Sequence, residues 1–164
     1  IEYDESTFQL WSEKKAEAYR LLVSESAHAM PGAIELVCSV FEKLPIGLAT
    51  GSRRSDVEAA FSTLAGGKLN GLFQSIVTSD DVAKTKPDPA TYAKAAEGMG
   101  ISPSDCLAID DSPNGVSSAK NAGMKVLGIT AIHNASSLKD ADWHLRSLEE
   151  VTLRDLINLF ECVS

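Results

Sequence analysis

The sequence predicts an α/β fold built on a parallel sheet, and two observations lead to this prediction. From residue 45 onward, short apolar runs alternate with stretches of helical periodicity, and the connections between them are short. Such alternation is typical of parallel strands joined by helices that cover both faces of the sheet. The apolar runs are also nearly continuous, as expected when both faces of a strand are buried. We therefore predict a three-layer, Rossmann-like arrangement.

Two helices are predicted before the first strand. Residues 6–25 carry apolar side chains at three- and four-residue steps, with charged side chains between them. Residues 31–43 form the second helix, because Pro31 suits a first-turn position and an apolar face follows it. The junction between the first helix and the α/β part is expected around residues 27–32.

The α/β part begins with residues 45–50, a short apolar run that ends in small polar residues. The next helix starts with a capping-box pattern, in which Ser55 is followed three residues later by Glu58, and two glycines end it after Leu64. Further strands are predicted at 75–78, 105–109, 125–129 and, more weakly, 143–145. Further helices are predicted at 90–98, 114–121, near 136–139, and at 149–160.

Composition and charge narrow the class of protein. The 164 residues are enough for one domain, and 44% hydrophobic with 23% charged residues is ordinary for a globular chain. A net charge of -8 argues against nucleic acid as a partner, because such binding depends on Lys and Arg neutralising phosphates. No apolar run approaches the roughly 20 residues of a membrane span. Three widely spaced cysteines indicate reduced thiols and a cytoplasmic location. The first residue, Ile1, leads us to expect a missing front end.

Polar residues follow each predicted strand, at the place where ligands bind in open α/β sheets. In chain order they are Thr50, Gly51 and Ser52; Lys86; Asp110 and Asp111; and Thr130. Because the carboxyl ends of parallel strands share one edge of the sheet, a hydroxyl, a lysine and a pair of carboxylates are expected to converge there.

The chemistry of this set is that of a phosphate and a metal ion. Adjacent carboxylates such as Asp110 and Asp111 suit Mg²⁺, which prefers oxygen ligands. Lys86 supplies a point charge for a phosphate. The Thr50 hydroxyl and the N–H groups at the start of the next helix can donate further hydrogen bonds to the same phosphate. Each feature alone has a common structural explanation, as a turn, a loop or a helix start. Their combination in this order indicates a phosphate-plus-metal site.

The segment 31–130 resembles the core of the haloacid dehalogenase superfamily, and is most similar to its phosphatase and β-phosphoglucomutase-like branch. The matching motifs are Pro31-Gly32 before a helix, residues 47–52 (GLATGS), 86–89 (KPDP), 107–115 (LAIDDSPNG) and 119–124 (AKNAGM). The resemblance implies that residues 1–27 are the C-terminal part of a helical cap. It implies that residues 28–164 are the α/β core.

The resemblance also assigns the phosphate-binding residues. It implies that the hydroxyl of Thr50 hydrogen-bonds a phosphoryl oxygen and that Lys86 neutralises the charge of the nucleophile and of the phosphoryl group. Gly51 and Ser52 are implied to add a backbone N–H or a hydroxyl near the phosphate. Such a site works mainly by positioning and charge stabilisation.

The metal-binding residues are assigned in the same way. The resemblance implies that Asp111 binds Mg²⁺ and that Asp110 binds it directly or through water. Together with Thr50 and Lys86 they are the expected catalytic residues of this chain. The implied substrate is a small phosphorylated metabolite, such as a sugar phosphate.

One part of the family pattern is missing from the sequence. The family nucleophile is the first Asp of an Asp-x-Asp-x-Thr motif at the end of its first strand, and no Asp of this chain lies in such a motif. That strand would lie in the middle of the sheet, between the strand ending at Thr50 and the one ending at Asp110. We therefore expect an N-terminally truncated core that lacks its first strand, is less stable than the intact protein, and is inactive alone.

Three functions stay open at this point. The leading one is a phosphatase whose nucleophilic Asp lies upstream of Ile1. A sugar-phosphate mutase similar to β-phosphoglucomutase would differ mainly in its cap. A phosphate-binding module without catalysis is the third. A receiver domain also groups acids, a hydroxyl and a lysine, but its acidic pair comes first and its lysine last, unlike the order Thr50, Lys86, Asp110 here.

Overall fold

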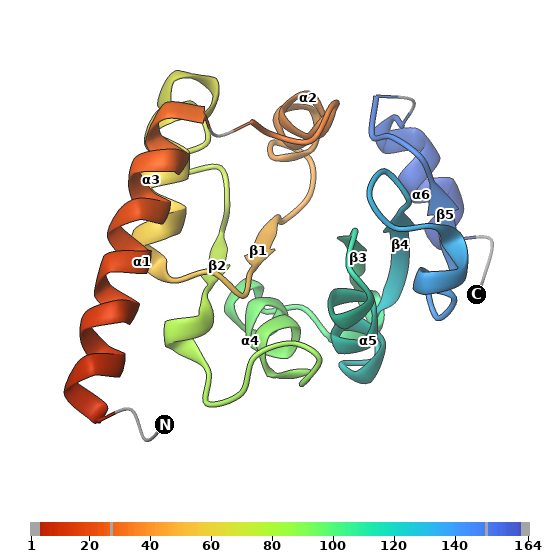
Figure 1. Ribbon diagram of the computed structural model, residues 1–164. Coiled ribbons are helices and arrows are strands. Elements are labelled where there is room, and N and C mark those ends of the chain that lie inside the picture. The colour runs from red at the N-terminus through yellow and green to blue at the C-terminus, as the bar shows by residue number, and fades with distance from the viewer. Residues whose placement is uncertain (1–3, 27, 150, 162–164) are drawn as a thin grey trace.

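The computed structural model describes residues 4–26, 28–149 and 151–161, and Figure 1 shows their arrangement. The helices are α1 (Glu5–Ser26), α2 (Ala33–Val40), α3 (Arg54–Thr63), α4 (Ala90–Met99), α5 (Pro113–Asn121) and α6 (Leu153–Glu161). The strands are β1 (Gly47–Ala49), β2 (Ser75–Val77), β3 (Leu107–Asp110), β4 (Lys125–Ile129) and β5 (Trp143–Leu145). The prediction of an α/β fold with parallel strands is confirmed.

Several predicted elements differ in detail. The helix expected at 31–43 is only Ala33–Val40, and α3 begins at Arg54, so the capping box expected from Ser55 is not its start. The short helix expected near 136–139 is a 3-10 turn over Ala135–Leu138. The last helix begins at Leu153 rather than at 149, because Thr152 and Asp155 cap it reciprocally. The Asp155 carboxylate accepts from the Thr152 backbone N–H at 2.9 Å, and the Thr152 hydroxyl accepts from the Asp155 N–H at 3.3 Å. This capping pattern satisfies N–H groups that the first helical turn leaves unpaired.

The strands form two separate parallel sheets. In one, β1 pairs with β2, and Leu48 lies opposite Ile76. In the other, β4 lies between β3 and β5, and Ile109 lies opposite Leu127. Figure 1 shows the two sheets apart from each other. Within the described ranges no strand lies between β1 and β3, which is the interval where the family resemblance places a further strand.

Helices connect the two sheets on both sides of this interval. In α2, Val37 belongs to the same hydrophobic cluster as Leu48 of β1. Leu36, also in α2, belongs to the same hydrophobic cluster as Ile109 of β3. In α4, Tyr92 belongs to a cluster that also holds Ala49 and Ala108, one residue from each of the facing strands. The carboxyl ends of β1 and β3 are therefore held near a common core although the strands do not pair.

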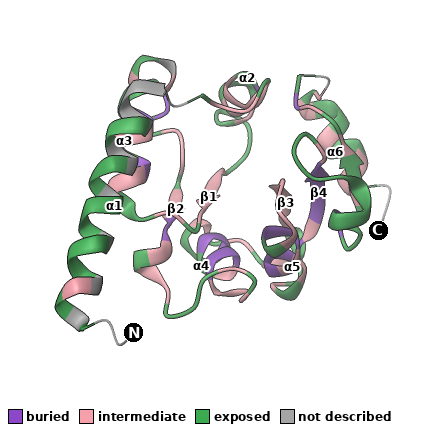
Figure 2. Cartoon of the chain, viewed as in Figure 1, coloured by how far each residue is buried: buried purple, intermediate pink, exposed green. Residues whose placement is uncertain are grey.

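The most buried part of the molecule lies around β4. Val126, Leu127 and Ile129 are at most 1% exposed, and Figure 2 shows the buried residues concentrated on β4, α4 and α5. Complete burial of such a side chain contributes about 1.5–3 kcal/mol. By contrast, Leu48 and Ile109, on the strands that face the interval, are only half-buried. The core is thus well formed on the β4 side and less so along the facing edges of β1 and β3.

The helix α1 packs against α3 but leaves much of its apolar surface uncovered. Four of its apolar side chains are more than half exposed: Leu10, Trp11, Leu21 and Leu22. None of the helices in the described ranges is both long and apolar enough to cross a membrane.

The turn after β2 is closed by a second reciprocal cap. The Asp81 carboxylate accepts from the Thr78 N–H at 2.8 Å, from the Thr78 hydroxyl at 2.7 Å and from the Arg54 guanidinium at 2.7 Å. The hydrogen bonds from Thr78, followed by that from Arg54, lower the pKa of Asp81 to about 2. This carboxylate therefore links the loop after β2 to the beginning of α3.

We expect Asp81→Asn to lower the free energy of unfolding near neutral pH and to matter progressively less in acid. The folded-state pKa lies below the ordinary value of 3.8, so the stabilising contribution is complete above about pH 4 and is lost as the pH falls toward 2. Urea unfolding of variant and wild type across this pH range measures the effect. Asp140→Asn, at an exposed carboxylate, is the matched control. A stability difference between Asp81→Asn and wild type that stays constant from neutral pH to 2 would contradict the prediction.

Candidate active site

The site is built at the carboxyl ends of β1 and β3. At the end of β1, the Thr50 backbone N–H donates to Val77 O at 2.9 Å and so extends the strand pairing by one residue. The Thr50 hydroxyl accepts from the Ser52 N–H at 3.1 Å. This small turn leaves the hydroxyl proton of Thr50 available as a donor, and α3 begins two residues after Ser52.

Lys86 and Asp110 form a buried ion pair with a tyrosine beside it. The Lys86 Nζ lies 2.7 Å from Asp110 Oδ2, and the two side chains are only 15% and 8% exposed. The Tyr92 hydroxyl donates to the same oxygen at 2.7 Å and lies 3.4 Å from Lys86 Nζ. The peptide bond between Lys86 and Pro87 is cis. The ion pair brings together Lys86 and Asp110, which are 24 residues apart in the chain.

The beginning of α5 holds the other oxygen of Asp110. Oδ1 accepts from the Ser112 N–H at 2.9 Å and from the Ser112 hydroxyl at 2.8 Å. Ser112 is the N-cap of α5, and its hydroxyl oxygen also accepts from the Gly115 N–H at 3.0 Å. A Cβ atom at Gly115 would lie only 2.0 Å from Asp110 Oδ1. Glycine is therefore required at this position, because the carboxylate occupies the space of a side chain.

These contacts decide the protonation states of Asp110 and Tyr92. Burial would by itself raise the pKa of Asp110, but the Lys86 ammonium and the hydrogen bonds outweigh it and hold this pKa below its ordinary value. Burial, together with the negative charge of Asp110, raises the pKa of Tyr92 well above its ordinary value. Asp110 is thus a carboxylate and Tyr92 a neutral hydrogen-bond donor.

Asp111 differs from its neighbour in having no hydrogen-bond or ion-pair partner among the described residues. It is half-buried at the end of β3. Mg²⁺ is commonly held by one or two carboxylates together with substrate phosphate, so an unengaged carboxylate next to the Lys86–Asp110 pair fits this ion. In the part of the chain that the structure describes, no three His, Cys, Asp or Glu residues gather to form a complete metal site.

The predicted site residues fall into two groups. Lys86, Asp110 and Asp111 lie together at the end of β3, and Thr50 with its turn lies at the end of β1. Tyr92 and Ser112 are contacts that the sequence analysis did not predict. Ser112 carries the N-cap signal of a serine before proline, whereas nothing in the sequence distinguishes Tyr92 from an ordinary apolar position of α4.

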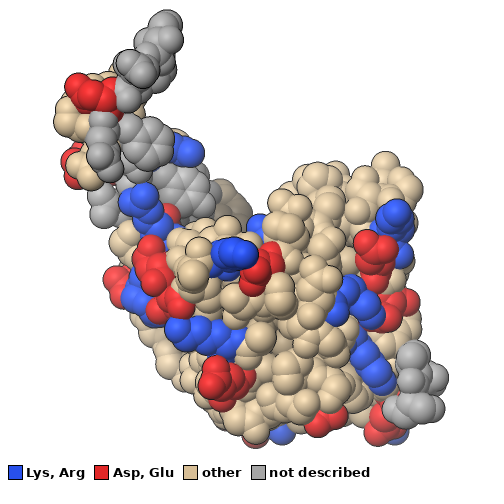
Figure 3. Space-filling view, turned by 90° about the horizontal axis from the view of Figure 1, so that it is seen from below, with Lys and Arg blue, Asp and Glu red and all other residues tan. Residues whose placement is uncertain are grey.

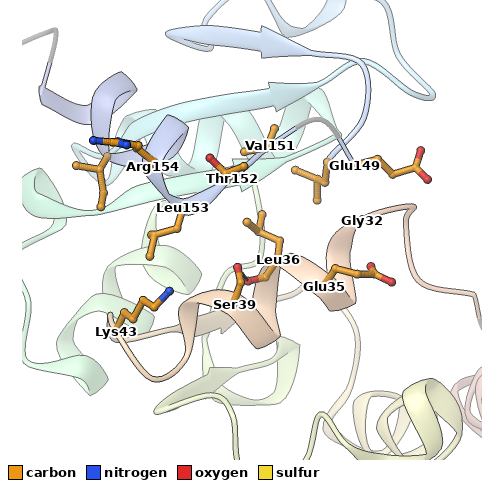
Figure 4. Close-up of a pocket in the computed structure, with 12 residues that line it drawn as sticks. Gly32, Glu35, Leu36, Ser39, Lys43, Glu149, Val151, Thr152, Leu153 and Arg154 are labelled. Atoms are coloured by element: carbon orange, nitrogen blue, oxygen red, sulfur yellow. Dashed lines mark hydrogen bonds between the residues drawn. The ribbon is translucent and has the colours of Figure 1, made fainter.

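A groove of about 820 Å³ lies elsewhere, between α2 and the segment that leads into α6 (Figure 4). Its lining includes Leu36, Ser39 and Lys43 on one side and Leu148, Leu153 and Ile157 on the other. Gly32, which also lines the groove, lies so close to the facing segment that a Cβ atom on it would be 2.3 Å from the backbone nitrogen of Glu149. None of the predicted site residues lines this groove.

Charge is mixed over the face seen in Figure 3, where acidic and basic side chains are interspersed. This face therefore presents both signs of charge rather than one dominant sign. Elsewhere in the described chain, two partly exposed ion pairs join Arg54 with Asp81 and Lys120 with Asp142.

Comparisons with known proteins place this geometry in a family. Residues 3–123 match the family of haloacid dehalogenase-like hydrolases. The chain is 36% identical over 127 residues to validoxylamine A 7'-phosphate phosphatase of Streptomyces hygroscopicus subsp. limoneus, covering 77% of this chain and 58% of that protein. It is 33% identical over 143 residues to β-phosphoglucomutase of Bacillus subtilis (strain 168), covering 85% of this chain and 60% of that protein.

Solved structures agree with this assignment. A hydrolase of the same superfamily from Entamoeba histolytica superposes with a TM-score of 0.84 at 25% identity, over 98% of this chain and 74% of that one. The chain therefore belongs to the haloacid dehalogenase-like hydrolases, in the branch of phosphatases and β-phosphoglucomutases. It spans 58% and 60% of the length of the two curated relatives named above.

Proposed function

We propose that the intact protein is a Mg²⁺-dependent phosphatase of a small phosphorylated metabolite. The observation that carries this proposal is the buried pair of Lys86 and Asp110 beside the unengaged carboxylate of Asp111. Homology to phosphatases supports phosphoryl transfer as the general chemistry. The names of the relatives, among them a fructose-1-phosphate phosphatase of Escherichia coli, favour a sugar phosphate or a similar metabolite as substrate.

Each residue has a role in this proposal. The Thr50 hydroxyl and Lys86 hold phosphoryl oxygens, with the Gly51 and Ser52 N–H groups near them. Asp111 holds Mg²⁺ directly, whereas Asp110, whose oxygens already accept four hydrogen bonds, acts through water or through Lys86. When bound, the metal ion supplies charge stabilisation at the phosphoryl group.

The nucleophile in this proposal is an aspartate outside the 164 residues, on a strand that inserts between β1 and β3. Three observations support this placement. The facing edges of β1 and β3 have no strand partner among the described residues, Leu48 and Ile109 on these strands are only half-buried, and α2 contacts both sheets across the interval. Residues 1–27 would then be the end of a helical cap, which accords with the exposed apolar side chains of α1.

A mutase is the second candidate, and the similarity to β-phosphoglucomutase favours it. The two functions differ in product, since a phosphatase releases inorganic phosphate and a mutase converts one hexose phosphate into its isomer. A cytoplasmic location belongs to either proposal and is supported by Cys38 and Cys106, which are free thiols in the described part of the chain. Incubation with hexose 1-phosphates, followed by assays for both products, separates the candidates.

Lys86→Ala tests the proposed site. We expect this change in the intact protein to reduce phosphate release in the presence of Mg²⁺ by about 10²-fold, because it removes a buried positive charge beside the phosphate. Lys84→Ala, in the same loop but exposed, is the matched control and should retain activity. Unfolding is measured in parallel, since an unpaired Asp110 also costs about 3–5 kcal/mol.

The same assay on the 164-residue chain alone tests where the nucleophile lies. We expect no turnover above that of its Lys86→Ala variant. Turnover above this background would contradict an upstream nucleophile. An intact protein that binds phosphate but releases none from any substrate would favour the non-catalytic binding module instead.

A further inference from the structure

We infer that Tyr92 is a positioning residue, whose hydroxyl orients the Lys86 ammonium toward the bound phosphate and keeps Asp110 engaged with that ammonium. The inference rests on the proposed function, since it deepens the role of the same site. Tyr92 comes from α4, whereas Asp110 lies at the end of β3 and Lys86 in the loop before α4. The tyrosine therefore joins two segments that the fold brings together.

Tyr92 contacts both members of the ion pair. Its hydroxyl donates to Asp110 Oδ2 at 2.7 Å, and its ring centroid lies 4.5 Å from Lys86 Nζ, within the range of a cation–π contact. The residue is only 7% exposed, so water has little access to these contacts. The Tyr92 ring limits the movement of the Lys86 ammonium on one side, and the Tyr92 hydroxyl limits the movement of the Asp110 carboxylate.

Counting donors shows what this arrangement leaves free. An ammonium has three N–H donors. In Lys86 one lies toward Asp110 at 2.7 Å and a second toward the Tyr92 hydroxyl at 3.4 Å, and no described residue accepts the third. With two donors directed by protein groups, the remaining one has a defined direction and is the donor available to a phosphoryl oxygen.

Counting acceptors gives the complementary result for Asp110. A carboxylate offers about four acceptor positions. Oδ1 takes the two donors of Ser112, and Oδ2 takes Lys86 and the Tyr92 hydroxyl. Without the hydroxyl, Oδ2 would have an open position for water, and Lys86 would have one contact fewer to hold its direction. The Tyr92 hydroxyl therefore fills the last acceptor position of Asp110 and directs the second donor of Lys86.

Tyr92→Phe tests this inference, because it removes the hydroxyl and keeps the ring. The readout is the Kd for inorganic phosphate, measured by calorimetry on the intact protein, together with kcat and KM. We expect phosphate binding to weaken about tenfold, because the Lys86 ammonium loses a contact that directs it; tenfold corresponds to about 1.4 kcal/mol of binding free energy. Thr91→Val is the matched control, since this neighbouring hydroxyl is fully buried without a hydrogen-bond partner.

A double-mutant cycle separates positioning from general structure. If Tyr92 acts through Lys86, then Tyr92→Phe should change the phosphate Kd less than twofold in a Lys86→Met background, because the ammonium it orients is gone. A merely structural tyrosine would weaken binding equally in both backgrounds, and that result would overturn the inference. Unchanged phosphate binding in Tyr92→Phe alone would overturn it as well. A wild type that binds no phosphate would reject the proposed function and the inference with it.

Discussion

Asp111→Asn is expected to reduce Mg²⁺-dependent phosphate release by about 10³-fold or more in the intact protein. The reason is that Asp111 is the carboxylate at the end of β3 with no partner among the described residues, whereas Asp110 is fully engaged. A metal ion contributes several kcal/mol of charge stabilisation, and each 1.4 kcal/mol corresponds to about tenfold in rate. Initial rates against Mg²⁺ concentration measure the effect, with calorimetry of Mg²⁺ binding as a second readout.

The control for this experiment lies in the 3-10 turn that precedes the same strand. Asp105→Asn removes an exposed carboxylate at the opposite end of β3 and should leave both rate and Mg²⁺ affinity unchanged. Because Asp111 makes no hydrogen bond in the described structure, its replacement should leave the free energy of unfolding within about 0.5 kcal/mol of wild type. An Asp111→Asn protein with normal Mg²⁺ affinity would show that the ion is bound elsewhere.

Gly115→Ala is expected to reduce activity at least as much as Lys86→Ala while also destabilising the protein. The added Cβ would lie 2.0 Å from both Cγ and Oδ1 of Asp110, so the carboxylate has to move. Its displacement takes the Lys86 ammonium with it, and a shift of about 1 Å in a catalytic group can cost 10²-fold. Overpacking of this kind lowers the free energy of unfolding by about 1–3 kcal/mol.

Two measurements distinguish this effect from simple loss of structure. Rates are taken well below the unfolding temperature of the variant, and the phosphate Kd is measured on the same preparation. Ser117→Ala changes a half-buried residue of α5 that is not among the hydrogen-bond donors to Asp110, and it should leave both quantities near wild type. A Gly115→Ala protein with full activity would mean that the Asp110 carboxylate does not need its observed position.

Much of the fold follows from local patterns. The apolar run at 105–109 predicts β3 to within two residues, the run at 125–129 predicts β4, and the helix expected at 114–121 begins one residue earlier, at Pro113. These signals work because strand burial and helix capping depend on residues that are near one another in the chain. The start of α6 was predicted four residues too early, since apolar periodicity alone does not reveal the reciprocal cap between Thr152 and Asp155.

Burial was harder to predict than secondary structure. The periodic apolar residues of α1 predict a helix correctly, yet Trp11 is 67% exposed in the described structure. An apolar stripe indicates which side of a helix is expected to be buried. The segment that covers this side belongs to another part of the protein, so the stripe does not identify it. Apolar periodicity does not predict the interval between β1 and β3 either. Its position was expected only from the family resemblance.

The amino-acid sequence by itself determined the family, the order of the elements and the residues Thr50, Lys86, Asp110 and Asp111 as candidates, because motif spacing and strand ends are local properties. Only the tertiary structure decided how the two adjacent acids differ. Asp110 faces Lys86 and α5 and accepts four hydrogen bonds, one of them from Tyr92, whereas Asp111 is unengaged among the described residues. Asp110 is the last residue of β3 and Asp111 the first residue after it, so these neighbours in sequence meet different surroundings in space.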